Sequence, residues 1–144
     1  MKKCIIMRGL PGSGKTLHVR QNCRNATIFS TDDYFIVDGA YRFDQTKLAE
    51  YHNKNLRRFI GYLDQNDYGS VVIDNTNVRL FELAPYYRIA EVFGWDVEIV
   101  WIQADIEKCV ARNTHGVPEA TIRTMANSFE PIPPWWKQRI VVNS

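Results

Sequence analysis

The sequence has no long hydrophobic run, few cysteines and little net charge, and each shortage narrows the class of protein. No apolar run approaches the roughly 20 residues that a membrane-spanning helix needs, so we expect no membrane partner. The apolar run after Met1-Lys2-Lys3 is about four residues long, whereas the core of a secretory signal needs ~7–15. We therefore expect a cytoplasmic protein.

The cysteines and histidines are too widely spaced in the sequence to suggest disulfides or a metal site. Their spacing matches neither a disulfide scaffold nor paired metal ligands, so we expect reduced thiols. The residues are Cys4, Cys23, Cys109, His18, His52 and His115. The formal net charge of +2 neither requires nor excludes a nucleic-acid partner, so any basic site must be local.

The length and composition suit one compact domain. The 144 residues are enough to bury a full core. The chain is 45% hydrophobic and 24% charged, which is ordinary for a globular protein. The one proline-rich stretch, residues 131–134, predicts a connector rather than a domain linker. We therefore expect residues 1–144 to form a single domain.

Short apolar segments alternate with segments of helical period. This order predicts an α/β fold with a parallel sheet of four to five strands and helices on both faces, because parallel neighbours need crossovers. The predicted strands are 3–8, 26–29, 70–74, 96–102 and 139–142. A helix that opens after the loop 9–14 is expected to run to about residue 23, and the other predicted helices are 44–64, 79–93, 105–113 and 118–130. Asp44 is the expected N-cap of the second helix, and Pro85 is a candidate for the true start of the third.

The segment GLPGSGKT, residues 9–16, follows the first predicted strand and opens a helix. This context indicates a phosphate-binding loop, in which glycines let backbone N–H groups converge on phosphates. The positive end of the helix dipole adds to the attraction. Lys15 is expected to reach the β- and γ-phosphates, and the Thr16 hydroxyl to bind Mg²⁺. The expected ATP-binding residues are Gly9, Pro11, Gly12, Ser13, Gly14, Lys15 and Thr16, with Arg112 from a later segment.

Two adjacent aspartates follow the second predicted strand in STDDYF, residues 30–35. Their position next to the expected γ-phosphate suits a carboxylate that orients or deprotonates an attacking hydroxyl. We assign this role to Asp32, with Asp33 as a structural partner. Helix capping is the alternative for both residues.

The third predicted strand ends in VVIDNTN, residues 71–77. An acidic residue at the end of a buried strand is typical of a Walker B aspartate, so Asp74 is expected to act on Mg²⁺ directly or through its waters. Thr76 and Asn77 offer donors to a substrate or to the phosphate loop. Capping of the strand end is the alternative.

Arg112 precedes Gly116 and Pro118 in a segment that suits a mobile lid. An arginine above the phosphates would stabilise the charge that develops during transfer. The alternative is a solvated arginine near a helix C-terminus, and the same ambiguity holds for Arg123. His115 is expected on the polar surface.

Taken together, these segments resemble the 5′-hydroxyl polynucleotide kinases, both the phage-type kinase domain and its animal relatives with a kinase-like P-loop domain. The resemblance covers nearly the whole chain. It rests on RGLPGSGKT at 8–16, STDDYF at 30–35, VVIDNTN at 71–77, FGWDVEIV at 93–100 and RNTHGVPEATIRTM at 112–125.

The resemblance implies a P-loop kinase fold with a helical lid, the cofactors ATP and Mg²⁺, and transfer of the γ-phosphoryl group to a nucleic-acid 5′-hydroxyl end. Lys15 and Thr16 match the family's phosphate and Mg²⁺ residues, and Asp32 matches its general base. Arg112 lies in the lid segment, where the family has an arginine on the nucleotide phosphates.

Two departures concern the acceptor and leave the ATP site intact. Phe35 stands where the phage-type enzyme has an arginine for the acceptor's phosphate. The lid is shorter, with the stretch around His115 in place of a second arginine. Phe35 is therefore counted among the expected substrate-binding residues, with Asp32, Thr76 and Asn77. Further candidates for acceptor contacts are Arg42, Lys54, Arg57, Arg58, Tyr34 and Tyr41.

Three functions follow from this pattern. The first is an ATP-dependent 5′-hydroxyl polynucleotide kinase. The second is a P-loop kinase for a small-molecule hydroxyl of a nucleoside, sugar or antibiotic, which Phe35 and the modest net charge favour. The third is a non-catalytic ATP-binding module. Trp135 and Trp136 are expected either to cover adenine or to pack the C-terminal tail.

Overall fold

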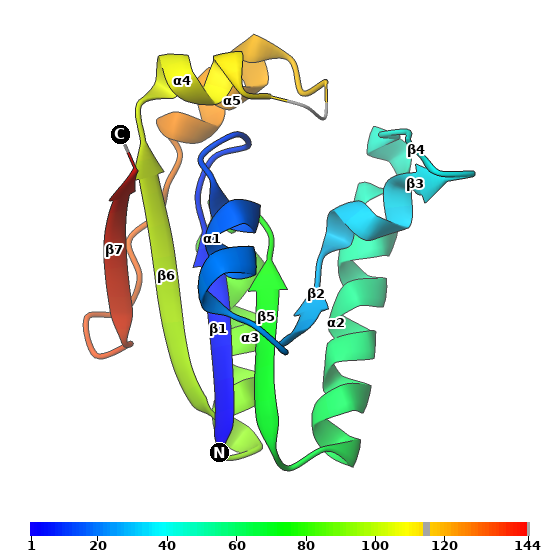
Figure 1. Ribbon diagram of the computed structural model, residues 1–144, viewed down its shortest axis with the longest axis vertical. Helices are drawn as coiled ribbons and strands as arrows, with labels where there is room; N and C mark the ends of the chain where they lie inside the picture. The colour runs from blue at the N-terminus through cyan, green and yellow to red at the C-terminus, as the bar shows by residue number, and fades with distance from the viewer. Residues whose placement is uncertain (114–115, 144) are drawn as a thin grey trace.

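The computed structural model describes residues 1–113 and 116–143 (Figure 1). The strands of the main sheet are β1 (Lys2–Arg8), β2 (Thr27–Phe29), β5 (Gly69–Asp74), β6 (Asp96–Ala104) and β7 (Gln138–Asn143). The α-helices are α1 (Lys15–Asn22), α2 (Leu48–Gln65), α3 (Leu80–Val92), α4 (Ile106–Ala111) and α5 (Glu119–Ala126). Two 3-10 helices, η1 (Thr31–Phe35) and η2 (Gln45–Lys47), and a small hairpin of β3 (Ile36–Val37) and β4 (Ala40–Tyr41) complete the order.

The main sheet has five strands in the order β2-β5-β1-β6-β7, and every neighbouring pair is parallel. Ile6 in the central strand β1 lies opposite Ile73 of β5 and Ile99 of β6. All the strands therefore end at the same edge of the sheet. The predicted α/β fold with a parallel five-stranded sheet is confirmed.

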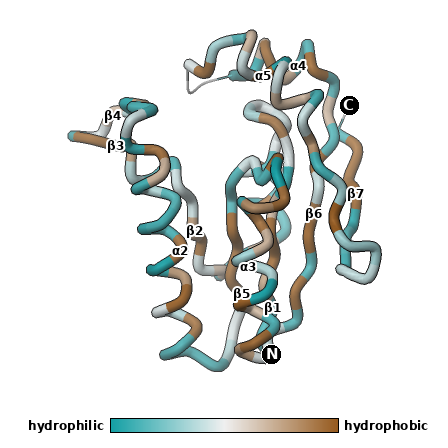
Figure 2. The backbone as a smooth tube through the Cα atoms, turned by 180° about the vertical axis from the view of Figure 1, so that it is seen from behind, coloured by the Kyte–Doolittle hydropathy of each residue, from teal (hydrophilic) through white to brown (hydrophobic). Residues whose placement is uncertain are grey.

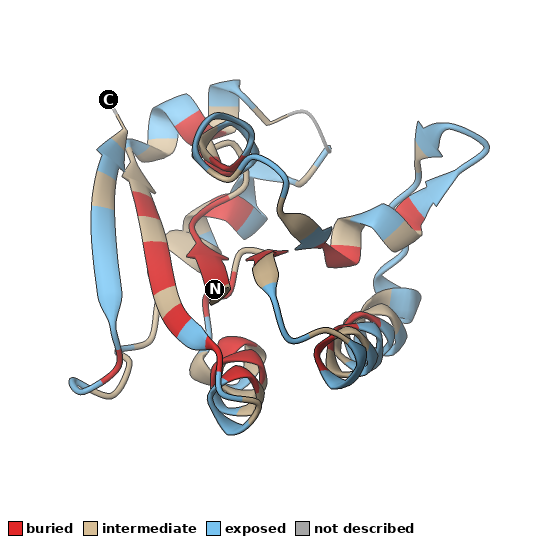
Figure 3. Cartoon of the chain, turned by 60° about the horizontal axis from the view of Figure 1, so that its bottom comes forward, coloured by how far each residue is buried: buried red, intermediate tan, exposed pale blue. Residues whose placement is uncertain are grey.

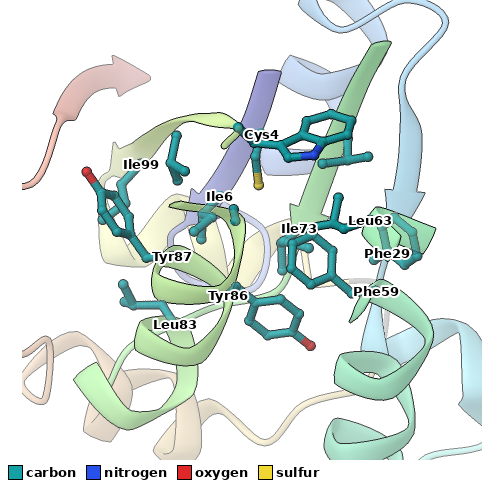
Figure 4. Packing of buried hydrophobic residues seen from close by; sticks show 14 of the residues in the cluster. Cys4, Ile6, Phe29, Phe59, Leu63, Ile73, Leu83, Tyr86, Tyr87 and Ile99 are labelled. Carbon is teal, nitrogen blue, oxygen red and sulfur yellow. The ribbon is translucent and has the colours of Figure 1, made fainter. Parts of the chain in front are cut away.

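Helices cover both faces of the sheet (Figure 1). On one face, Val19 of α1 packs with Ile5, Met7 and Val72. On the other face, α2 and α3 cover a larger cluster that contains Ile6, in which Phe59 and Tyr86 meet edge to face with ring centroids 5.1 Å apart (Figure 4). Hydrophobic residues are concentrated along the central strands (Figure 2), and β7 is the exposed outer strand (Figure 3). Apolar side chains on the two faces of the sheet thus pack against a helical layer on each side.

The alternative helix start at Pro85 and the predicted helix end at residue 130 are both wrong. Helix α3 begins at Leu80, so Pro85 lies inside it. The carboxylate of Glu82 accepts the Arg79 backbone N–H, and Glu130 accepts that of Leu80, so the helix start is capped before the proline. Helix α5 ends at Ala126, not at residue 130.

The short hairpin of β3 and β4 was not expected from the sequence. Its turn is Asp38-Gly39, and both residues have positive φ, at 52° and 79°. This Asp-Gly pair is a strong signal for a two-residue hairpin turn. Asp44 does accept a hydrogen bond from the Thr46 backbone N–H at 3.0 Å, but it caps η2, the 3-10 turn before α2.

The carboxyl ends of the strands form the functional edge of the molecule. The loop after β1, the turn η1 after β2 and the segment after β5 all emerge there, and α4 and α5 lie above them (Figure 1). Among residues 1–113 and 116–143, no helix is long and apolar enough to cross a membrane. In open α/β sheets ligands bind beyond this edge, so the candidate site lies around the loop after β1.

Candidate active site

The loop from Gly9 to Gly14 is held in shape by its neighbours. The Gly9 N–H donates to Thr76 O at 3.0 Å, which ties the loop to the segment after β5. Gly12 and Gly14 have φ values of 79° and 100°. A Cβ on Gly12 would lie 2.4 Å from the carbonyl oxygen of Cys109 in α4. Glycine is therefore required at position 12 both by its backbone conformation and by the lid above it.

Lys15 lies inside this loop. Its Nζ donates to the carbonyl oxygens of Gly9 and Leu10 at 2.9 and 2.8 Å. Burial lowers the pKa of Lys15, and the negative charges of Asp74 and Asp32 act against this shift. The buried hydroxyl of Ser13 has no hydrogen-bond partner among the residues that the structure describes. A loop with a buried cation and an unpaired buried hydroxyl fits an anionic phosphate ligand.

A hydroxyl and a carboxylate lie side by side next to the loop. The Thr16 hydroxyl donates to Asp74 Oδ2 at 3.0 Å. Burial raises the pKa of Asp74, and the positive charge of Lys15 opposes the rise. Oxygen ligands of this kind suit Mg²⁺, which keeps several waters and takes its other ligands from phosphates. Within the described ranges no cluster of three or more acidic, histidine or cysteine side chains forms an all-protein metal cage. The Thr16–Asp74 pair thus fits a magnesium ion shared with a nucleotide.

Asp32 is in the turn η1, across from this pair. The Tyr41 hydroxyl donates to Asp32 Oδ1 at 3.1 Å, and burial followed by the Asp32 charge raises the pKa of Tyr41. The Asp32 charge also acts on Lys15 and Asp74. The structure therefore brings the predicted phosphate residue, the predicted Mg²⁺ residue and the predicted base within electrostatic reach of one another.

Asp33 is more exposed than Asp32, and the charge that favours its ionised form is that of Arg58. Burial raises the pKa of Asp33, and Arg58 partly reverses the shift. The two neighbouring aspartates therefore have different surroundings, as the sequence led us to expect.

Two of the predicted substrate residues are part of the protein interior. Phe35 is 1% exposed, and its ring lies 4.8 Å from that of Tyr51 and 5.1 Å from that of Phe43. Asn77 is also 1% exposed, and its Nδ2 donates to Met7 O at 2.7 Å. This burial argues against substrate contacts for Phe35 and Asn77 and gives both a packing role. Thr76 lies partly exposed beside the loop.

The lid consists of α4 and α5, which pack on the loop through Leu10, Cys109 and Ile122. Arg112 is exposed at the C-terminal end of α4. Arg123 bridges the two helices, because its guanidinium pairs with Glu107 at 2.7 Å and with Glu119 at 3.0 Å. Arg123 therefore has a structural role here. His115 lies outside the described residues.

An open cleft of about 750 Å³ is lined by residues of α2, α3 and α5. Most of its wall is apolar, with Leu48 and Leu56 from α2 and Met125 from α5. Its polar lining includes His52, Thr76, Glu82 and the threonines of α5. The cleft reaches Thr76, whose carbonyl oxygen accepts the Gly9 N–H, so one end of the cleft adjoins the phosphate loop.

Two of the basic candidates for acceptor contacts, Lys54 and Arg58, lie in α2 next to η1 and β2. Lys54 Nζ is 5.0 Å from the centroid of the Tyr34 ring. The Arg58 guanidinium is 4.7 Å from the Phe29 ring centroid and donates to Ile28 O. Both cations therefore brace η1 and β2 against α2, whereas Arg42 and Arg57 are exposed.

Two residues that sequence reasoning missed hold the site together. Arg8, 1% exposed at the end of β1, donates to the carbonyl oxygens of Asn77, Val78 and Glu130. Its guanidinium also stacks over Trp101, 4.9 Å from the ring centroid. A charged residue directly before a phosphate loop is expected at the protein surface, so the sequence did not predict that Arg8 is buried. Tyr41 was considered only as a stacking surface, although the Asp-Gly turn before it predicts the hairpin that brings it to Asp32.

The C-terminal tryptophans divide into a buried and an exposed residue. Trp136 is 9% exposed and stacks on Tyr87 with ring centroids 4.1 Å apart. Trp135 is 80% exposed. Packing of the tail is therefore the role of Trp136.

The sequence matches the model of one protein family and is similar to part of a much longer human protein. Residues 4–132 match the model of a protein family described as AAA domain. Human NEDD4-binding protein 2 is 32% identical over 133 residues, which cover 88% of this chain. The chain spans only 8% of the length of that relative.

Solved structures that superpose on this chain include kinases. A sugar kinase from Janibacter sp. HTCC2649 superposes with a TM-score of 0.66 and 13% identity, covering 99% of this chain and 86% of the kinase. The APS kinase of Mycobacterium tuberculosis, in complex with AMPPNP and APS, superposes with a TM-score of 0.62 and 16% identity, covering 98% of this chain and 88% of that enzyme. At these identities the likeness shows a shared P-loop kinase fold and nothing more. The chain belongs to the AAA domain family, in the form of a P-loop kinase-like domain.

Proposed function

We propose that this domain is an ATP-dependent kinase that transfers the γ-phosphoryl group to the 5′-hydroxyl end of a DNA or RNA strand. The observation that carries the proposal is the convergence of Lys15, the Thr16–Asp74 pair and Asp32 at one edge of the sheet. A nucleotide-binding module without catalysis has no need for a carboxylate held opposite its phosphate loop.

In the proposed reaction, Asp32 accepts the proton of the acceptor hydroxyl as that oxygen attacks the γ-phosphorus. The new O–P bond forms in line with the breaking bond to the β-phosphate, and ADP leaves. Tyr41 holds one carboxylate oxygen of Asp32, which orients the other toward the hydroxyl. Lys15 exchanges its loop carbonyls for phosphate oxygens, and Arg112 neutralises charge from the lid. Thr16 and Asp74 would hold Mg²⁺, which would neutralise part of the negative charge of the phosphates during transfer.

A nucleic-acid acceptor is supported by the five sequence blocks that resemble polynucleotide kinases. The cleft of about 750 Å³ is large enough for a terminal nucleotide, and its apolar wall suits a base that leaves its stack. A small-molecule hydroxyl is the second candidate, because the cleft lining carries one arginine, Arg79, and no lysine among the described residues. A strand would then depend on cations outside the cleft, such as Arg42 and Arg57.

The test is phosphate transfer from labelled ATP to 5′-hydroxyl DNA and RNA oligonucleotides by the wild-type protein, Asp32→Asn and Asp33→Asn. Asp33 is the matched control, because it is the adjacent carboxylate and is exposed. Loss of a positioned base lowers kcat by about 10²–10⁴. We expect this loss for Asp32→Asn, and a near-normal rate for Asp33→Asn.

Equal activity of Asp32→Asn and the wild-type protein would refute the assignment of the base. Transfer to nucleosides or sugars without transfer to oligonucleotides would move the function to the second candidate. The salt dependence separates the two further, since affinity for a strand falls steeply with salt concentration and affinity for an uncharged acceptor does not.

A further inference from the structure

His52 connects the turn that carries Asp32 to the cleft. It lies in α2, and its Nδ1 is 3.0 Å from the Thr31 hydroxyl oxygen. Thr31 directly precedes Asp32 and is 3% exposed. The Thr31 backbone N–H donates to Asn75 Oδ1 at 2.9 Å. Thr31 is therefore held from two sides, by α2 and by the segment after β5.

The other side of the His52 ring lies in the cleft. His52 is part of the cleft wall, together with Leu48 and Leu56 about one helical turn away on either side. Thr31 is buried and is not part of that wall. Because Nδ1 is engaged by Thr31, the Nε2 side of the ring is the side that a molecule in the cleft would meet.

The surroundings of His52 keep its imidazole neutral at pH 7. Burial lowers the pKa of His52, and the charges of Glu82 in α3 and Asp32 in η1 oppose this shift only in part. Arg79 is the remaining charged residue of the cleft wall, and α5 presents the uncharged Thr121 and Thr124. A neutral ring that accepts the Thr31 hydroxyl proton at Nδ1 carries its own proton on Nε2.

We propose that His52 is a positioning residue that holds the Asp32 turn through Thr31 and donates from Nε2 to an oxygen or ring nitrogen of the acceptor. This role rests on the proposed kinase function and adds a determinant of acceptor choice. The acceptor class that it favours has a hydrogen-bond acceptor near its reactive hydroxyl, as the sugar and base of a terminal nucleotide do. Nucleotide binding at the phosphate loop does not involve His52.

The proposal predicts a pH effect with a defined sign. Protonation of His52 turns Nδ1 into a donor, so the Thr31 hydroxyl must rotate and accept instead, and the new positive charge competes with the acceptor hydroxyl for the Asp32 carboxylate. Activity with the acceptor therefore falls as the pH drops through the lowered pKa of His52 and is retained above it. A variant that lacks the imidazole loses this part of the acid limb.

Four variants separate the two hydrogen bonds. His52→Asn keeps an amide near the position of Nδ1 and has no atom at Nε2, whereas His52→Gln reaches the Nε2 position. Thr31→Val removes the hydroxyl at constant shape, and Thr31→Ser retains it. Steady-state KM for acceptor and for ATP, kcat, and the pH profile between about 5 and 8 are measured for each. NMR titration of the His52 ring gives a readout that needs no catalysis.

We expect His52→Asn to raise the acceptor KM about tenfold, as for one net hydrogen bond, with the KM for ATP unchanged. His52→Gln should recover part of this loss. Thr31→Val should lower kcat and raise the His52 pKa in the NMR titration, and Thr31→Ser should do neither.

Three results would overturn the role of His52. The first is an acceptor KM and a pH profile in His52→Asn that equal those of the wild-type protein. The second is an equal rise of the KM for acceptor and the KM for ATP in His52→Asn. The third is a His52 titration that is unchanged in Thr31→Val. A wild-type protein that transfers phosphate to no acceptor would overturn the proposed kinase function and the donor role with it. The NMR titration would then still decide whether His52 and Thr31 are coupled.

Discussion

Replacement of Gly12 by alanine tests how the lid and the phosphate loop are joined. The new methyl group would lie 2.4 Å from the carbonyl oxygen of Cys109, so either α4 or the loop must move. The positive φ of Gly12, 79°, costs alanine about 1–2 kcal/mol by itself. Overpacking adds about 1–3 kcal/mol. We therefore expect a loss of about 2–5 kcal/mol in the free energy of unfolding.

Gly39 is a matched control for this substitution. It has the same φ of 79°, and no atom of residues 1–113 and 116–143 lies within 4 Å of a Cβ at this position. Gly39→Ala should therefore cost only the conformational term of about 1–2 kcal/mol. At about 3 °C per kcal/mol, Tm should fall by ~6–15 °C for Gly12→Ala and by ~3–6 °C for Gly39→Ala.

Thermal unfolding followed by circular dichroism measures both Tm values, and fluorescence titration with ATP measures the affinity. Affinity for ATP should fall in Gly12→Ala, because the displaced loop no longer presents its N–H groups together, and should persist in Gly39→Ala. Equal falls in Tm for the two variants would show that the contact with Cys109 does not affect the stability of the protein. Unchanged ATP affinity in Gly12→Ala would refute the claim that this loop holds the nucleotide.

Two further predictions concern hydrogen bonding and packing. Tyr41→Phe removes the hydroxyl that orients Asp32, so kcat should fall about tenfold while the ATP affinity measured by titration stays constant; a matching loss of affinity would point to general damage instead. Trp136→Ala removes the ring stacked on Tyr87 and should cost about 3–5 kcal/mol in urea unfolding, whereas Trp135→Ala at the exposed neighbour should stay within about 0.5 kcal/mol. Comparable losses for the two tryptophans would contradict the packing role of Trp136.

The order of strands and helices was predictable because each central element carries a clear pattern. The strands at residues 3–8, 70–74 and 96–102 are short apolar runs, and the structure extends them by at most two residues at an end. The long helix α2 also follows its spacing of three and four residues. Such patterns show which side of a strand or helix is apolar, and in this fold the apolar sides of the sheet and of its helices are buried against one another.

The small elements around Asp32 were harder to foresee. Hairpin β3–β4 has two residues per strand, which is too short for any periodicity to register. Its Asp38-Gly39 turn was the available signal. Phe35 shows the opposite difficulty. An aromatic residue beside a predicted base suits either a substrate platform or a core, and only the packing of Tyr51 and Phe43 around it distinguishes the two.

The phosphate loop could be predicted from the chain alone, since the glycines, Lys15 and Thr16 act through backbone geometry and bonds within one short segment. The position of Asp74 at the end of a strand, and of Asp32 just after another, was predictable in the same way. The surroundings of the two aspartates depend on the packing of distant segments. Tyr41 and His52 reach the Asp32 turn from segments that lie 9 and 21 residues away, and Arg8 reaches carbonyl groups up to 122 residues away. Such contacts depend on how helices and loops pack over the sheet edge, and no local pattern in the chain records that packing.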